Sequence, residues 1–186
     1  NGNIGDWNVS KVVDMQSMFA DAHSFNQDIS AWDPGSVQNM EKMFYKAKSF
    51  NQNIGNWNVE TVTNIGLIFH RCEEFNQDLS NWEISGLTST FGAFSYTSKF
   101  NQDLSSWDFS NIEDMRWMFR QATSFNQNLG NWNVSSVSRM DFMLDGSGLS
   151  SDLYDSILIG WSKLSLRDSV DFNVGTTQYS SGMPAL

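Results

Sequence analysis

Cysteine and proline are almost absent from this 186-residue chain, which has one cysteine and two prolines. The single cysteine, Cys72, excludes an intrachain disulfide, so the chain is not a small secreted domain held together by disulfides. No apolar run approaches the ~18 residues that a membrane-spanning helix requires. We therefore expect no membrane insertion by this segment.

Basic residues are also scarce: 11 Lys and Arg face 21 Asp and Glu, which gives a net charge of −10. Nucleic-acid binding depends on a basic stripe that replaces the counterions of the phosphates. The charge therefore predicts that nucleic acid is not a partner, and it argues against binding to an anionic membrane surface.

Aromatic residues are abundant at 14% of the chain, and they recur at a fixed spacing. The tripeptide Phe-Asn-Gln begins at residues 25, 50, 75, 100 and 125, and tryptophan stands at 7, 32, 57, 82, 107 and 132. Such self-similarity without insertions predicts six coils of 25 residues, each stacked on the last in the same way. We number coil positions by the residue number modulo 25.

Within a coil, apolar residues occupy positions 12, 15, 18 and 19, as in Val12, Met15, Met18 and Phe19. This spacing is typical of one helix face, so positions 11–20 are predicted to form a short helix. Positions 1–5 are predicted to form a short parallel strand. The expected fold class is thus α/β, a leucine-rich-repeat-like solenoid with a parallel sheet and with one short strand and one short helix per coil.

Two regions are expected: a six-coil repeat solenoid over 1–148 and a C-terminal capping segment over 149–186. Apolar residues between Leu149 and Trp161 lie on one helical face, and a solenoid needs a cap over the last coil. Residues 170–174 alternate and predict a final strand. The chain begins at coil position 1, without a preceding phenylalanine or a signal peptide, so we expect a fragment of a longer array.

These repeats resemble a known family. The run Met-x-x-Met-Phe followed by Ser-Phe-Asn-Gln-Asp-Ile-Ser and Trp, seen across 25–32, 40–50 and 115–132, is similar to the BspA-like bacterial surface repeats found also in mycoplasma lipoproteins. The segments 149–161 and 177–181 resemble the closing segment of that family. The resemblance implies a leucine-rich-repeat solenoid on a secreted or surface-anchored bacterial protein, an association with adhesion, and no catalytic motif. The fourth coil departs from the pattern at Thr88, Thr90, Phe91 and Ala93.

The charges separate by coil position. Positions 0–10 contain no Lys or Arg through residue 135, but they contain eight acidic residues. Position 3 is always Asp or Asn, which makes its members the candidate ligand-binding residues: Asp28, Asn53, Asp78, Asp103 and Asn128. Asp78 and Asp103 would lie about 5 Å apart in stacked coils, and clustered carboxylates suit Ca²⁺. The alternatives are a cation site at Asp78 and Asp103, with no other cofactor, or a row of solvated side chains.

The Asn and Gln of the Phe-Asn-Gln tripeptide are expected to form hydrogen-bonding ladders between coils. If exposed, they would instead suit glycan hydroxyls. Catalysis has little support, because His23 and His70 are about two coils apart and a nucleophile needs a positioned base. Cys72 stands where other coils have alanine, so it is predicted to be a small buried residue. No catalytic residue is assigned.

The expected function is a non-enzymatic adhesion or interaction module at the cell surface, whose acidic strand side binds a protein or glycan on another cell or matrix, either alone or with cations. The alternative is a structural spacer of a longer surface protein. Exposed positions should be uniform in a spacer, but Tyr45, His70, Arg120 and Gln121 differ from their counterparts in other coils, which favours recognition. An enzyme using Tyr154, Asp155 and Trp161 of the cap is a third hypothesis, although these residues fit helix packing better.

Overall fold

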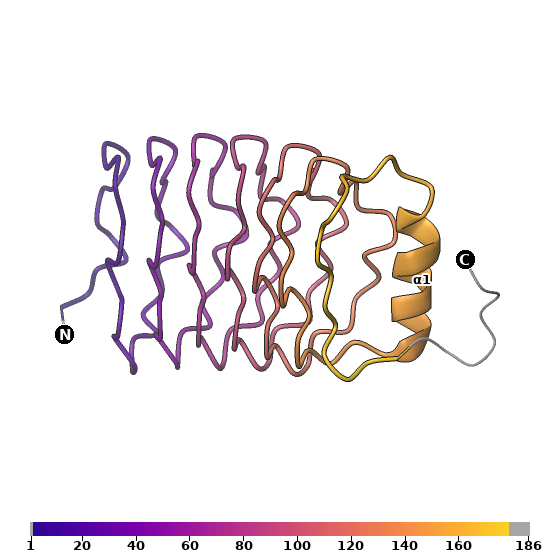
Figure 1. The fold of residues 1–186 in the computed structure, drawn as a ribbon. Coiled ribbons are helices and arrows are strands. Elements are labelled where there is room, and N and C mark those ends of the chain that lie inside the picture. The colour runs from indigo at the N-terminus through magenta and orange to yellow at the C-terminus, as the bar shows by residue number, and fades with distance from the viewer. Residues whose placement is uncertain (1, 179–186) are drawn as a thin grey trace.

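The coils lie side by side in one elongated stack, closed at the C-terminal end by a single helix (Figure 1). The computed structural model describes residues 2–178. Its one helix in that range is α1 (Ser151–Trp161). Asn1 and residues 179–186, which include the end of the predicted capping segment and of the resemblance at 177–181, lie outside the described residues.

The predicted parallel sheet, with one strand and one helix per coil, is wrong. The described residues of the coils form turns joined by isolated parallel bridges, and no continuous strand or helix occurs in them. The bridges between coils link position 14 of neighbouring coils, as in Asp14 with Asn39 and Asn39 with Asn64. Backbone pairing therefore occurs in the segment expected to be helical and not at positions 1–5.

Positions 15–22 are not helical because their N–H groups point in two directions. The N–H groups of Met15 and Ser17 donate to carbonyl oxygens one coil further on, each at 2.9 Å, and position 19 does the same. The N–H of Met18 instead donates to the carbonyl of Met15, three residues back, at 3.2 Å. In an α-helix every N–H would point the same way, to the fourth residue back.

Backbone conformation repeats with the same period. Positions 17 and 21 adopt the left-handed region in every coil, with φ between 55° and 68°, and in most coils they are not glycine. An L-residue pays about 1–2 kcal/mol for that conformation. The apolar spacing that suggested a helix therefore arises from successive turns, which the hydrogen bonds between coils hold in place.

Positions 1 and 2 do not form a strand because side chains replace the backbone acceptor. The Oδ1 atom of Asn26 accepts bonds from the Asn51 N–H and the Gln52 Nε2, both at 2.9 Å. The same pair of bonds repeats from coil to coil, through Asn51, Asn76 and Asn101. The predicted Asn and Gln ladders are confirmed, and we call them the amide ladder.

The core consists of aromatic stacks that run along the molecule. Position 19 rings stack at centroid separations of 5.6–5.7 Å between coils, and position 0 rings at 5.8–6.1 Å. Within a coil the two rings stack more closely, as in Phe44 with Phe50 at 3.9 Å. The Trp57 and Trp82 indoles donate to position 4 carbonyls of the preceding coils, at 3.2 and 3.0 Å.

The cap reuses this tryptophan contact. Trp161, the last residue of α1, is buried and its indole donates to the Leu129 carbonyl at 2.9 Å. Gly160 lies so close to Gly130 that a Cβ there would overlap the carbonyl oxygen of Gly130. The helix predicted between Leu149 and Trp161 is confirmed. The strand predicted at 170–174 is not formed, and one parallel bridge between Met140 and Phe172 stands in its place.

Replacing Asn76 with alanine tests the amide ladder. The change removes an Oδ1 that accepts bonds from the Asn101 N–H and the Gln102 Nε2, each at 2.9 Å. We expect the free energy of unfolding to fall by about 0.5–1.5 kcal/mol, because the Asn101 N–H and the part-buried Gln102 amide both lose this acceptor. Asn76→Asp keeps an acceptor and should cost less than Asn76→Ala.

Urea unfolding measures both changes. Asn81→Ala is the matched control, since Asn81 is exposed and makes only a long 3.5 Å contact to Asn56. Equal stability of the Asn76→Ala and Asn81→Ala variants would contradict a structural role for the ladder.

Candidate functional site

The position 3 column, predicted to bind a ligand, closes a turn in every coil. The Oδ1 atom of each Asp or Asn accepts the backbone N–H two residues further on, for example Ser80 to Asp78 and Ser105 to Asp103, both at 2.8 Å. Asn53 and Asn128 make the same bond to glycine N–H groups at 3.1 and 2.9 Å. Asn and Asp alternate in this column because either side chain supplies the acceptor.

Asp28 belongs to the same column and shows its electrostatic consequence. Hydrogen bonds from the backbone N–H and the hydroxyl of Ser30 lower the pKa of Asp28 below its usual value. The two hydrogen bonds from Ser30 therefore stabilise the charged carboxylate without an external cation. In the described part of the chain, no group of three or more His, Cys, Asp or Glu side chains could hold a metal ion. A calcium ion at Asp78 and Asp103 stays a prediction.

Two substitutions at Asp103 separate turn closure from ligand binding. Asp103→Asn keeps the acceptor for the Ser105 N–H, so its thermal stability should match the parent protein. Asp103→Ala removes the acceptor and should lower the free energy of unfolding by about 1 kcal/mol.

Thermal melts repeated with millimolar Ca²⁺ test the predicted metal site. A rise in the melting temperature of the parent that is absent in Asp103→Asn would support a bound cation.

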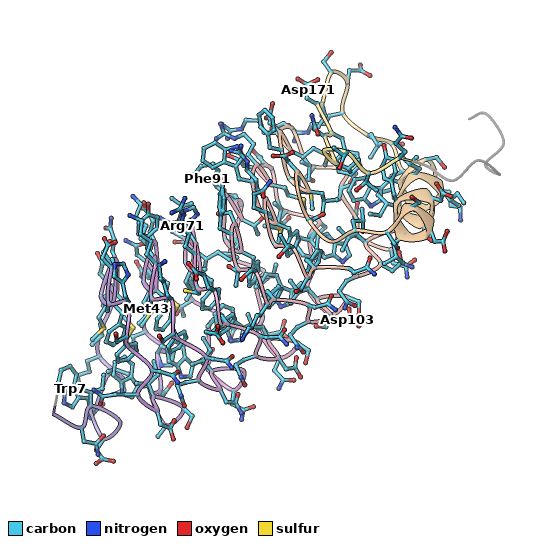
Figure 2. The ribbon with its side chains drawn as sticks, turned by 90° about the horizontal axis from the view of Figure 1, so that it is seen from below. Trp7, Met43, Arg71, Phe91, Asp103 and Asp171 are labelled. Carbon is cyan, nitrogen blue, oxygen red and sulfur yellow. The ribbon has the colours of Figure 1, made fainter. Side chains whose placement is uncertain are left out.

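A second surface lies on the opposite long side of the stack. Figure 2 shows Arg71 and Phe91 projecting on one side and Asp103 on the other. The surface is formed by residues at coil positions 16, 17, 20 and 21, where the sequence varies from coil to coil. We call it the edge cluster, and its members are Tyr45, Lys46, His70, Arg71, Phe91, Tyr96, Arg116, Trp117, Arg120 and Phe142.

The N-terminal half of the edge cluster combines rings and cations across three coils. The rings of Tyr45 and His70 stack at 4.9 Å, and His70 meets Tyr96 edge-on at 5.5 Å. The Lys46 ammonium lies 4.9 Å from the centre of the Tyr45 ring, and the Arg71 guanidinium 5.0 Å from that of Tyr96. Apart from the adjacent Tyr45 and Lys46, these contacts join residues 25 or 26 apart, which the repeat places in neighbouring coils.

The C-terminal half repeats the arrangement. The Arg116 guanidinium lies 5.3 Å from the Phe91 ring centre, and Arg120 lies 5.2 Å from Trp117 and 5.3 Å from Phe142. Phe91 and Trp117 are 5.4 Å apart. Cations and aromatic rings thus alternate along the edge of five consecutive coils.

Ion pairs distinguish the cations of the edge cluster. Arg116 binds the buried Asp114 through two nitrogens, at 3.0 and 2.8 Å, and Arg120 reaches Asp145 at 3.2 Å. Burial raises the pKa of Asp114, but the hydrogen bonds from Arg116 outweigh it, so the net pKa lies below the usual value. Lys46 has only a 3.4 Å contact to the exposed Asp21. Among the described residues, Arg71 forms no ion pair.

His70 sits under these cations and is only 9% exposed. Its Nδ1 lies 2.7 Å from the Ser95 Oγ. Burial, with the nearby charges of Arg71 and Lys46, lowers the pKa of His70 from 6.5 to about 4. The imidazole is therefore neutral at pH 7. Cys72, predicted to be a small buried residue, is confirmed as buried: its thiol donates to the Phe44 carbonyl and burial raises its pKa.

The depressed pKa of His70 predicts a pH dependence of stability. The unfolded chain binds a proton near pH 6.5, while the folded chain resists it until about pH 4. Stability contributed by neutral His70 should therefore be lost as the pH falls through this window. In His70→Gln that part of the loss should disappear, as measured by thermal melts between pH 7 and pH 4. His23→Gln, the matched control, should keep the parental slope; an unchanged slope in His70→Gln would contradict the assignment.

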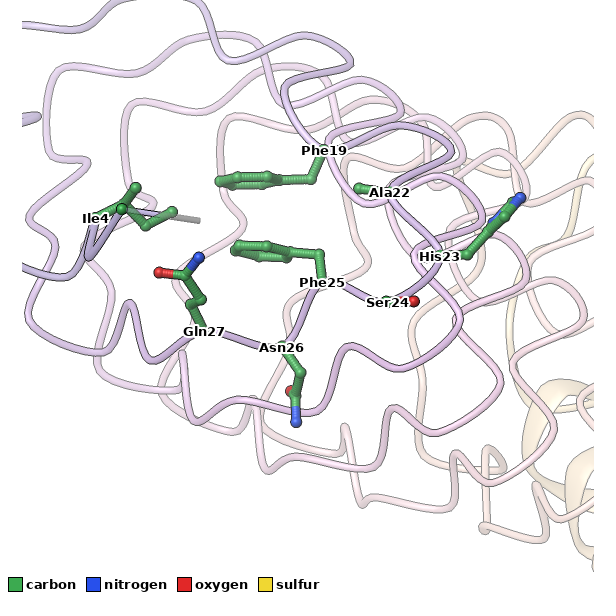
Figure 3. A pocket seen from close by; sticks show the side chains of 9 residues that line it. Ile4, Phe19, Ala22, His23, Ser24, Phe25, Asn26 and Gln27 are labelled. Atoms are coloured by element: carbon green, nitrogen blue, oxygen red, sulfur yellow. The ribbon is translucent and has the colours of Figure 1, made fainter.

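Two cavities lie at the ends of the stack. One, of about 590 Å³, is the uncovered face of the first coil, where Ile4, Phe19 and Phe25 lie beside Gln27 (Figure 3). The other, of about 270 Å³, lies between the sixth coil and the cap and is mainly apolar. The cap residues of the enzyme hypothesis pack against neighbours: the rings of Trp161 and Tyr154 lie 5.0 and 6.2 Å from Phe172, and Asp155 is buried.

Comparison with known families identifies these repeats. The family model described as "Mycoplasma protein of unknown function, DUF285" matches residues 1–82 and again 52–155. The chain belongs to the DUF285 family. Overlap of the two DUF285 matches over residues 52–82 is the behaviour expected of a repeat, and together they cover all six coils and the start of α1. No curated protein and no solved structure matches the chain.

None of the described helices is long and apolar enough to cross a membrane. The position 3 residues lie in one column, as the sequence predicted, whereas the edge cluster could be predicted only in part from the sequence. Variation between coils singled out Tyr45, His70 and Arg120, but not their contacts with Lys46, Arg71 and Trp117.

Proposed function

We propose that the chain is a non-enzymatic interaction module of a bacterial surface protein of the BspA-like type, which binds a protein or glycan on another cell or matrix. The edge cluster carries this proposal, because it is the surface on which a uniform scaffold presents different residues from coil to coil.

The contrast between neighbouring positions supports binding. Position 19 is Phe in five coils and Leu in the sixth, and it faces the core. Position 20, the next residue, is Ala, Tyr, His, Ser, Arg and Asp in successive coils. A protein that served only as a spacer would not require different residues at position 20 from coil to coil. Tyr, Trp and Arg are also the residues that carry most binding energy at protein interfaces, and the edge cluster contains three Arg, two Tyr and one Trp.

The surface location rests on the resemblance of the repeats to BspA-like proteins and on membership of a mycoplasma family. A stack whose coils all share one register suits display, because each added coil extends the molecule without changing the others.

Binding arrays test the proposal. The labelled chain is applied to arrays of extracellular-matrix proteins and of glycans, beside an Arg71→Gln/Tyr96→Gln variant. Glutamine is chosen because Gln121 holds the same left-handed position in the fifth coil, with φ 57°. We expect the variant to lose binding that the Asp103→Asn control retains.

Two outcomes would count against the proposal. Equal binding by the edge variant and the control would move the binding surface away from the edge cluster. An absence of binding on both arrays would favour the structural spacer.

A further inference from the structure

We infer that the edge cluster docks an acidic segment of a protein partner, with Lys46 and Arg71 receiving its carboxylates and the neighbouring rings contacting its nonpolar side chains. This inference rests on the proposed function and specifies the chemistry of the partner.

The location of charge supports an acidic partner. The chain carries a net charge of −10, yet coil positions 0–10 hold no Lys or Arg through residue 135. Coil positions 16, 17, 20 and 21 hold five of the 11 basic residues and also four acidic residues. The acidic residues lie in the first, second and sixth coils, so in the third to fifth coils the charged residues at these positions are all basic: Arg71, Arg116 and Arg120. An acidic partner is therefore repelled by the position 3 side and attracted to the edge cluster, which fixes the orientation of approach.

Lys46 and Arg71 are the cations available to a partner. They occupy position 21 in neighbouring coils, and coil-to-coil spacing in a stack with strand-like pairing is about 4.8 Å. Arg71 is exposed and has no carboxylate partner among the described residues, while Lys46 makes one 3.4 Å contact to an exposed carboxylate. Exposed pairs of this kind are weak and exchange readily. Arg116, in contrast, is committed to the buried Asp114.

The rings hold these cations in place before a partner arrives. The 5.0 Å contact of Arg71 with Tyr96 and the 4.9 Å contact of Lys46 with Tyr45 restrict two long side chains. Both residues also have a left-handed backbone, with φ 59° and 57°, which the turns of the stack fix. A cation ordered in advance loses less conformational entropy on binding a carboxylate.

The same contacts favour a peptide over a sugar. A pyranose binds aromatic residues by stacking on a ring face, but His70 and Lys46 already lie against the Tyr45 ring, and Arg71 lies over Tyr96. A partner side chain can still reach the ring edges and the guanidinium. Acidic residues at alternate positions of an extended segment are about 7 Å apart, which two long cationic side chains on backbones one coil apart can span.

A displayed library of 12-residue peptides with Asp or Glu at alternate positions tests the inference. Peptides selected by the parent chain are measured by fluorescence anisotropy against Arg71→Gln and Lys46→Gln. We expect each variant to bind about tenfold more weakly, and affinity to fall as salt is raised. Lys11→Gln is the matched control, because it removes the same charge from an exposed residue outside the edge cluster and should bind as the parent does.

The outcomes separate this inference from the proposed function. Equal binding of peptides in which Gln replaces every acid, or an equal loss in Lys11→Gln, would overturn it. So would failure of the library to yield any binder. If a sulfated glycan binds in an Arg71-dependent manner while acidic peptides do not, the partner is an anionic glycan; the inference then fails and the proposed function stands. Absence of any partner on the arrays would contradict both the inference and the proposed function.

Discussion

Stacked aromatic rings impose the constraint on which the other features depend. Phe44 is 5.6 Å from Phe19 and 5.7 Å from Phe69, so every coil must meet its neighbours at one spacing and in one register. An insertion within a coil would move its rings out of the column and leave buried gaps on both sides. The absence of insertions over six coils follows from this, and so does the placement of variation at side chains that point away from the core.

Hydrogen bonds between coils are compatible with the spacing of the stacked rings because each coil uses two kinds of acceptor at different positions. Near position 15 the acceptors are backbone carbonyls, and at position 1 they are side-chain amides. The turns at positions 3, 8 and 14 are compatible with this pairing because side-chain oxygens of the same coil close them, as at Asp103, Asp108 and Asp114. The side chains of Asp78 and Asp103 therefore have a structural role in closing the turns of the coil, and this role does not depend on a ligand.

The sequence predicted some of this and misled elsewhere, for physical reasons. The period located the core and the amide ladder, because buried rings and paired amides tolerate little change, and the apolar spacing between Leu149 and Trp161 located α1. The prediction of a helix in each coil was wrong, because apolar residues three apart occur in successive turns as well as in helices. Left-handed residues such as Lys46 and Arg71 also cannot be recognised from the sequence, because they are not glycine. At position 3, interchange of Asp and Asn was a sign of turn closure. Most contacts of the edge cluster join residues 22–26 apart in neighbouring coils, and only the stack reveals these contacts.

The amide ladder has a consequence for how such chains change over time. Asn51, Asn76 and Asn101 make the same bonds to their successors, so the stack does not distinguish one inner coil from another. Genetic loss or duplication of a whole 25-residue unit leaves every remaining bond of the amide ladder with an equivalent partner, whereas a shift of one residue breaks the ladder bonds at that junction. Recombination between repeats can thus reshuffle the exposed edge residues as cassettes, and a new recognition surface arises without a new fold.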